Sequence, residues 1–308
     1  MPVRVTKLLL ITLMSWSFGP TNGQSIKALP VSFSANLIYL NIPLPDNDTL
    51  VMYLDTGGKN FMYKSGLKKL EIRPTRKNLH SRVRLDEIFL QNSIPVSYKK
   101  DLYFLNDNDN TCDGMLGREW YANKIWLIDY RNKQMFAIES YSEEILSISA
   151  TIPVSFRKDT SGSISNHLPG VQVVIDGDTL SMLLDTGAQA QLSDQATSAF
   201  NQSGTSSISF IDQSTFEKWE QLHPDWRVVK GGDTSLRVAE DIIEVPGVNI
   251  GDTIVGPVYF AKRADQNFVV MSNNFMDQQI TGALGANALS QLGQIILDYP
   301  QQRLLILE

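Results

Sequence analysis

The sequence predicts an all-β protein made of two similar lobes with a cleft between them, and three observations support this fold class. The phrase DTLVMYLDTGGKN, at residues 48–60, returns with few changes as DTLSMLLDTGAQA at residues 178–190. Each copy is followed by a Gly-apolar-Leu-Gly motif and later by an Asp-Tyr pair in an apolar stretch. Most other segments alternate or run apolar over a short length, which is typical of β-strands.

Each unit begins with strands that lead into Asp-Thr-Gly. The stretches LVMYL before Asp55 and SMLL before Asp185 are continuous and apolar, which is typical of buried strands. The motifs GMLG and GALG follow, and after them come the short helix candidates REWYANK and ANALSQL. Each unit then ends in an apolar strand that runs into Asp129-Tyr130 or Asp298-Tyr299, a turn and a second apolar strand. The same order of elements therefore occurs twice.

The boundary between the two units lies near Ser147, so we expect lobes at residues 24–147 and 148–308. The first unit is compact, since 61 residues separate its Asp-Thr-Gly from Leu116, against 99 for the corresponding pair in the second. The surplus falls mainly in residues 201–240. That insertion includes STFEKWEQL, which offers a helical capping box and stops at Pro224.

The first 23 residues have the character of a signal peptide. Arg4 and Lys7 precede the apolar run LLLITLMSWSF, which is too short to cross a bilayer as a helix, and small residues follow as far as Gly23. We expect cleavage after Gly23 and an exported protein in the periplasm, at the cell surface or secreted, with no membrane span in the mature chain. An uncleaved anchor is the alternative.

Composition excludes several functions. A formal net charge of −6 in 308 residues argues against nucleic acid as the main partner. Cys112 is the one cysteine, so no disulfide can form within the chain, and with three histidines there are too few ligands for a His/Cys zinc site. No metal or other cofactor is implied.

One stretch is basic despite the negative total. It is either a solvated face of the first lobe or a rim that attracts acidic segments of a substrate. Its cations are Lys64, Lys68, Lys69, Arg73, Arg76, Lys77, Arg82 and Arg84.

The repeated triplet suggests chemistry that needs two carboxyl groups. An Asp at the end of a buried strand holds its carboxylate at the edge of a dry core, and the nearby Gly permits a sharp turn with exposed backbone N–H groups. Two such carboxyls at close range cannot both ionise, so they share one proton and can activate a water for amide hydrolysis. The residues concerned are Asp55, Thr56, Gly57, Asp185, Thr186 and Gly187.

These paired motifs resemble those of the aspartic proteases. The chain resembles the pepsin-like enzymes in carrying both halves, and the retropepsin-like enzymes in the compactness of its first half. The resemblance implies a pepsin- or retropepsin-like fold with two six-stranded-type lobes, catalytic Asp55 and Asp185, and Thr56 and Thr186 hydrogen bonding across the twofold. It also implies a β-hairpin flap, although no residue between Gly58 and Cys112 matches one. One triplet alone is a weak signal, but two in matching surroundings are a strong one.

Two positions depart from the pepsin-like pattern. Ser or Thr usually follows Asp-Thr-Gly, but this chain has Gly58 and Ala188. Fewer donors to the charged carboxylates should raise their pKa values, so we expect an activity optimum that is mildly acidic to near neutral.

The sequence thus predicts an exported aspartic endopeptidase that acts as a monomer on extended peptide or protein substrates. Two alternatives stay open: a catalytically weak peptide-binding module on the same fold, and a structural surface protein whose two acids lie too far apart to share a proton.

Overall fold

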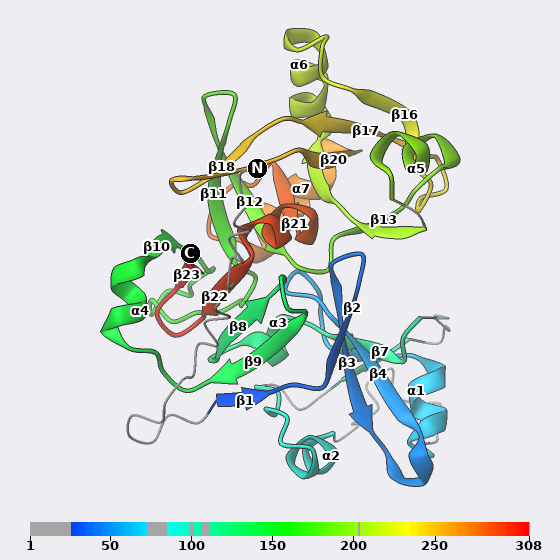
Figure 1. Ribbon diagram of the computed structural model, residues 1–308, viewed down its shortest axis with the longest axis vertical. Coiled ribbons are helices and arrows are strands. Elements are labelled where there is room, and N and C mark those ends of the chain that lie inside the picture. Colours follow the sequence, from blue (N-terminus) through cyan, green and yellow to red (C-terminus); the bar gives the residue numbers. More distant parts are fainter. Residues whose placement is uncertain (1–25, 73–84, 99–101, 106–110, 203, 308) are drawn as a thin grey trace, which may run out of the picture.

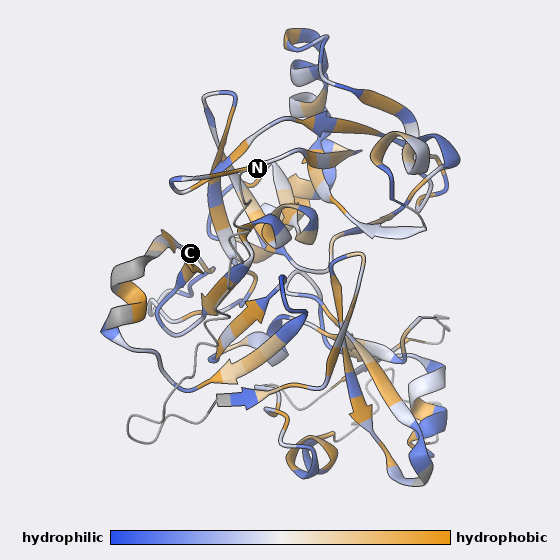
Figure 2. Cartoon of the chain, viewed as in Figure 1, coloured by the Kyte–Doolittle hydropathy of each residue, from blue (hydrophilic) through white to orange (hydrophobic). Residues whose placement is uncertain are grey.

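The structure of the protein is a computed structural model that describes residues 26–72, 85–98, 102–105, 111–202 and 204–307 (Figure 1). It is mostly β and contains three larger sheets: one from the first half, one from the second half and one shared by both. Strands β4 and β8 are largely coloured as hydrophobic in Figure 2, in keeping with their mostly buried side chains. The predicted all-β fold class is confirmed.

The first-half sheet has six strands. In sheet order they are β2 (Val31–Ser34), β3 (Leu37–Pro43), β4 (Thr49–Leu54), β7 (Gly114–Leu116), β5 (Phe61–Met62) and β6 (Tyr103–Phe104). A 3-10 turn at Pro45–Asn47 joins β3 to β4, and two short helices, α1 (Lys64–Lys69) and α2 (Asp86–Gln91), accompany the sheet. Its core strand β4 is apolar over most of its length, as its sequence predicts.

The second-half sheet has nine strands. In sheet order they are β16 (Val228–Asp233), β17 (Glu240–Val245), β20 (Val258–Arg263), β15 (Ser209–Asp212), β21 (Gly282–Gly285), β12 (Asp178–Asp185), β11 (Gly170–Ile175), β18 (Val248–Ile250) and β19 (Thr253–Val255). A separate two-stranded ribbon joins β13 (Gln189–Gln191) to β14 (Thr205–Ser207).

The shared sheet joins the two Asp-Tyr hairpins side by side. Its order is β1 (Ile26–Ala28), β9 (Gln134–Ile138), β8 (Ile125–Asp129), β22 (Gln294–Asp298), β23 (Arg303–Leu307) and β10 (Ser149–Pro153). Strands β8 and β22 run antiparallel with Leu127 opposite Ile296 at the centre. The two hairpins are thus related by an approximate twofold that passes between these residues, and the sheet lies beside both halves in Figure 1.

Eight α-helices occur in the described part of the chain. Besides α1 and α2, six helices follow the last strand of the first-half sheet. They are α3 (Arg118–Tyr121), α4 (Glu143–Ile148), α5 (Asp194–Phe200), α6 (Gln213–Leu222), α7 (Asp265–Phe275) and α8 (Ala286–Leu289), the last followed by a 3-10 turn at Ser290–Leu292. The predicted helices at REWYANK, ANALSQL and STFEKWEQL correspond to α3, α8 and α6. The cap of α6 differs from the expected box, because Asp212 accepts from the Thr215 N–H at 2.8 Å.

Both halves place Asp-Thr-Gly by the same strand pairing. Strand β4 lies parallel to β7, with Leu54 opposite Leu116, and β12 lies parallel to β21, with Leu184 opposite Leu284. Each Gly-apolar-Leu-Gly motif therefore lies alongside the strand that leads to Asp55 or Asp185. In the described part of the chain, no helix is long and apolar enough to cross a membrane. The expected signal peptide, residues 1–23, lies outside that part.

Candidate active site: a carboxyl pair between the two halves

The two predicted acids lie at the same position of equivalent strands. Asp55 follows the last residue of β4, and Asp185 is the last residue of β12. Asp55 is 8% exposed, although no cation of the described residues forms an ion pair with it, and Asp185 is partly buried. Burial of an unpaired carboxylate is unfavourable, so each group must find compensation from its neighbours.

The glycines of the two triplets show how closely the acids approach each other. A Cβ added to Gly57 would lie 2.6 Å from Asp185 Cγ, and one added to Gly187 would lie 2.3 Å from Asp55 Cγ. Each loop therefore packs its backbone directly against the carboxyl group of the other half, and the two carboxyls hydrogen bond to each other. Only glycine permits this reciprocal contact.

The two threonines connect the halves beneath the carboxyls. The Thr56 N–H donates to Thr186 Oγ1 at 3.1 Å, and the Thr186 N–H donates to Thr56 Oγ1 at 3.0 Å. Each hydroxyl then donates across the interface, Thr56 to the Leu184 carbonyl at 2.7 Å and Thr186 to the Leu54 carbonyl at 3.3 Å. All these groups are buried, so the network fixes the spacing of the loops.

Backbone groups hold the carboxylates from their own loops. The Gly57 N–H donates to Asp55 Oδ1 at 2.7 Å, and the Gly187 N–H donates to Asp185 Oδ1 at 3.1 Å. Side-chain donors are missing at the next position of both loops, which holds Gly58 and Ala188. A Cβ on Gly58 would lie 2.7 Å from Asp55 Oδ2 and 2.4 Å from the Met115 sulfur, so a Ser in the first loop would require these side chains to shift.

The pair is electrostatically unequal. Burial raises the pKa of Asp185 well above its ordinary value, and the negative charge of Asp55 and the hydrogen bond to it raise that pKa further. Burial also raises the pKa of Asp55, but the hydrogen bond from Asp185 and the Gly57 and Gly58 N–H groups act in the opposite direction. The two carboxyls therefore titrate as a coupled pair, in which the pKa of Asp185 is raised more than that of Asp55.

Sequence reasoning missed one residue that touches this site. The Tyr53 hydroxyl donates to the Gly187 carbonyl at 2.8 Å, so a side chain of the first half holds the loop of the second half that follows Asp185. Tyr53 is 4% exposed, and burial together with the two nearby carboxyls raises its pKa well above 10.0. The one signal in the sequence was the contrast between Tyr53 and Leu183, which occupies the same place in the second copy.

A second aromatic group lies under the site. Tyr121 and Tyr299 stack with ring centroids 6.2 Å apart, and both side chains are fully buried. Burial raises the pKa of both hydroxyls well above 10.0, and the charge of Asp55 contributes to each. These two neutral, buried phenols therefore lie near Asp55 in a part of the structure that is shielded from solvent.

Other predicted features lie away from the carboxyls or outside the described residues. Residues 73–84, which hold five cations of the basic stretch and part of the expected flap region, are not described. In the rest of that stretch, Lys64 and Lys68 are exposed on α1, whereas Lys69 pairs with Asp113 at 2.7 Å.

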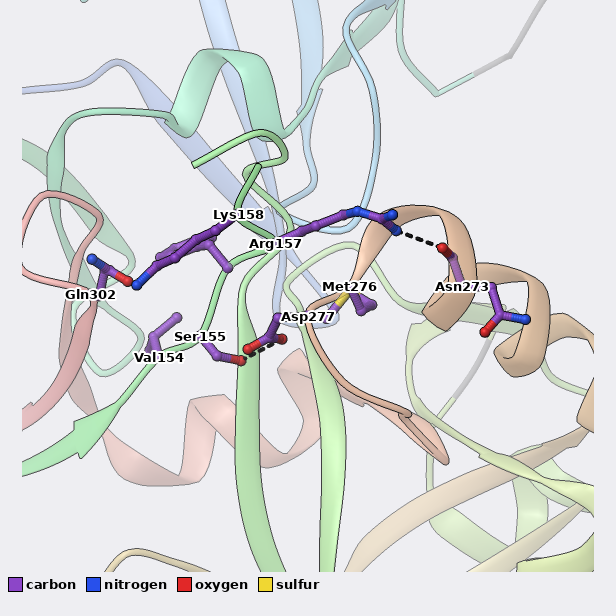
Figure 3. Close-up of a pocket in the computed structure, with 9 residues that line it drawn as sticks. Val154, Ser155, Arg157, Lys158, Asn273, Met276, Asp277 and Gln302 are labelled. Carbon is purple, nitrogen blue, oxygen red and sulfur yellow. Dashed lines mark hydrogen bonds between the residues drawn. The ribbon is translucent and has the colours of Figure 1, made fainter. Parts of the chain in front are cut away.

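The cavity shown in Figure 3 is separate from the carboxyl pair. It has a volume of about 600 Å³ and lies between the 154–158 segment, the end of α7 and Gln302. Arg157 donates from its guanidinium to the Asn273 carbonyl at 2.6 Å, and Ser155 donates to Asp277 at 3.0 Å. None of the six predicted site residues lines it. In the described residues no cluster of three or more His, Cys, Asp or Glu could hold a metal ion.

Comparison with known proteins gives likeness in structure only. No family model and no curated protein sequence matches the chain. Among solved structures, an aspartic proteinase from Irpex lacteus matches at 10% identity over 91% of this chain and 96% of its own, with a TM-score of 0.48. A retropepsin-like aspartic protease from Rickettsia conorii matches at 12% identity over 51% of this chain and 90% of its own, with a TM-score of 0.30.

A third structure is named as a globulin. Conglutin gamma, a basic 7S globulin from lupine seeds, matches at 9% identity over 92% of this chain and 95% of its own, with a TM-score of 0.43. Because these identities and TM-scores are low, we base the assignment on the repeated strand pairing and the reciprocal loops described above. The chain has two halves with equivalent strand pairing and brings Asp55 and Asp185 together where the halves meet, an arrangement similar to that of the pepsin- and retropepsin-like aspartic proteases.

Proposed function

We propose that the protein is an aspartic endopeptidase that hydrolyses peptide bonds with a water activated by Asp55 and Asp185. The single observation that carries the proposal is the reciprocal packing of each Gly against the Asp of the other half. This packing brings a buried and a partly buried carboxyl into hydrogen-bond contact, so that the pair holds one proton between them. A pair in that state contains both a base and an acid.

The chemistry follows from the unequal pKa values. The water oxygen forms a bond with the peptide carbonyl carbon while Asp55 accepts a proton from this water. At the same time Asp185 donates its proton to the carbonyl oxygen. The tetrahedral intermediate then loses its C–N bond: Asp55 returns its proton to the amine, and a hydroxyl of the intermediate returns a proton to Asp185. The product is a carboxylic acid plus an amine, and the dyad is restored.

Extended peptides are the proposed substrates. The carboxyls lie at the ends of strands β4 and β12, where the halves meet, so an extended segment laid across the junction can contact both halves. Backbone hydrogen bonds to strand edges would then provide affinity with little dependence on sequence.

The test is hydrolysis of denatured casein, followed by mass spectrometry of the fragments. We expect cleavage by the wild type, loss of at least about 100-fold in rate for Asp55→Asn and Asp185→Asn, and inhibition by a statine-containing peptide. Surface variant Asp252→Asn serves as the control. If both active-site variants cleave casein as fast as the control, the dyad is not catalytic. If the wild type binds the statine peptide but cleaves nothing, the protein is a peptide-binding module.

Export belongs to the same proposal. Arg4, Lys7 and the apolar run after them have the pattern of a secretory signal. Expression of the full chain in a bacterial host, fractionation and N-terminal sequencing would test it. The expected protein is periplasmic and begins near Gln24, and a cytoplasmic protein that keeps its first 23 residues would contradict export.

A further inference from the structure

Positive charge follows the first catalytic loop but not the second. Lys59 lies two residues after Gly57, where the second copy has the neutral Gln189. Arg118 follows the first Gly-apolar-Leu-Gly motif, where the second copy has Ala286. The two halves of the site are therefore alike in their carboxyls but different in the charges beside them.

Neighbouring backbone bonds fix the position of Lys59. The side chain of Asn60, which is buried, accepts from the Gly117 N–H at 2.7 Å, and the Arg118 N–H donates to the Gly58 carbonyl at 3.1 Å. The loop on both sides of Lys59 is thus anchored to the strand end at GMLG. Lys59 itself is exposed, so its side chain extends from this anchored loop into solvent.

The ammonium group lies among aromatic rings from both halves. Lys59 Nζ is 5.8 Å from the ring centroid of Tyr103, on β6, and 5.8 Å from that of Phe275, at the end of α7. The Arg118 guanidinium is 5.4 Å from the same Phe275 ring. These contacts place Lys59 where the first half meets the second, beside the loop that carries Asp55, and the rings remove part of its hydration.

Lys59 and Arg118 differ in how their charges are balanced. Arg118 is 3.2 Å from the Glu119 carboxylate, and both side chains are mostly buried. In the described ranges Lys59 forms no ion pair. Among the described residues, Lys59 is therefore a positive charge beside the first loop that an incoming group can neutralise, and the second copy has the neutral Gln189 at the matching position.

We infer that Lys59 forms a carboxylate-binding subsite, so that the protein selects peptides with Glu or Asp on one side of the scissile bond. The inference rests on the proposed function for its substrate class. A peptide in extended form advances about 3.3 Å per residue, so an acidic side chain within a few residues of the reacting bond can reach the exposed ammonium. Because Lys59 has the neutral Gln189 as its counterpart, we expect the preference for an acidic residue at one peptide position only. The position related to it by the twofold, on the other side of the scissile bond, should show none.

The experiment compares peptides that differ only in a carboxylate or a carboxamide on one side chain. A set of fluorescent peptides carries either Glu or Gln at each position from four before to four after a common cleavable bond. For each pair we measure kcat/KM with the wild type, Lys59→Gln, Lys59→Arg and Lys68→Gln, the last an exposed lysine of α1 with the same change in charge. Peptide affinity is measured in parallel by fluorescence anisotropy with Asp185→Asn, alone and combined with Lys59→Gln.

We expect a Glu/Gln ratio of about two to five at one position for the wild type, decreasing at high salt. Lys59→Gln should bring the ratio near one, whereas Lys59→Arg and Lys68→Gln should keep it. A ratio near one for the wild type, or a ratio that survives Lys59→Gln, would overturn the subsite while the endopeptidase stands. If no peptide is cleaved but the affinity ratio depends on Lys59, the subsite stands and the proposed hydrolysis fails.

Discussion

The Tyr53 hydroxyl donates a hydrogen bond to the Gly187 carbonyl at 2.8 Å, across 134 positions of sequence. The bond joins a strand of the first half to the loop that holds Asp185. Because the N–H of the same Gly187 donates to the Asp185 carboxylate, Tyr53 holds in place the loop that binds this carboxylate. The second half has Leu183 at the matching position, so it offers no equivalent hydrogen bond to the loop of the first half.

Substitution Tyr53→Phe removes this brace with little change of volume. We expect a loss of about 1–3 kcal/mol in unfolding free energy, because the buried Gly187 carbonyl loses its partner, and a lower kcat with KM nearly unchanged. Urea unfolding and steady-state kinetics measure both effects. Tyr98→Phe, at an exposed tyrosine of the same half, should change stability by less than about 0.5 kcal/mol. Equal effects of the two variants would contradict a positioning role.

Substitution Gly187→Ala tests the reciprocal loops. The new Cβ would lie 2.3 Å from Asp55 Cγ, so the two carboxyls must separate. A displacement of about 1 Å at a reacting group can reduce a rate about 100-fold, and we expect at least that loss of activity. Gly247→Ala is a matched control, because its Cβ would meet only Ile254 at 3.4 Å. Normal activity of Gly187→Ala would show that the loops are not in contact.

The pH dependence of hydrolysis follows from the raised pKa values. The acidic limb reflects protonation of Asp55 and the alkaline limb reflects loss of the proton held by Asp185, and burial raises both pKa values. The bell of kcat/KM should therefore be centred in the mildly acidic to near-neutral range. A profile of kcat/KM against pH on one peptide measures this, and a maximum in the strongly acidic range would be inconsistent with the burial of the pair.

Stability should depend on pH in the opposite sense to that of a salt-bridged Asp. The pKa of Asp185 is higher in the folded than in the unfolded chain, so the folded state binds the proton more tightly. Its contribution is fully present below the ordinary carboxyl pKa, about 4, and is lost as the pH rises toward the folded pKa. The loss amounts to about 1.4 kcal/mol for each pH unit that separates the unfolded from the folded pKa.

Asp185→Asn avoids that loss because the amide stays neutral and can donate to Asp55. We expect the variant to melt at a higher temperature than the wild type at neutral pH, with a difference that shrinks as the pH falls toward about 4. Calorimetry at several pH values tests this. If the wild type instead became more stable than the variant as the pH rises, the pKa of Asp185 would not be raised in the folded chain.

Local sequence predicted those parts of the fold that depend on local patterns. The apolar runs before Asp55 and Asp185 predicted buried strands, and capping chemistry predicted α6, although Asp212 supplies its cap. Helix α7 was not predicted, since its Val and Asn residues are weak helix formers and no side chain caps its start. Tertiary contacts therefore determine it.

The candidate site was predictable to the extent that it repeats. Two copies of Asp-Thr-Gly predicted a pair, and the structure places Asp55 and Asp185 together. The Tyr53 bond and the place of Lys59 beside Phe275 break the repeat and join distant segments, so no single-strand pattern indicates them. Such contacts become visible only when the packing of the two halves against each other is known.

The most direct test of a shared proton is carboxyl ¹³C NMR on protein labelled at Asp Cγ, with Asp55 and Asp185 assigned from their Asn variants. We predict two coupled titration steps, with Asp185 still protonated well above the ordinary carboxyl range and Asp55 ionised first. Two independent titrations near a pKa of about 4 would show that the carboxyls act separately, and would contradict the account of the site.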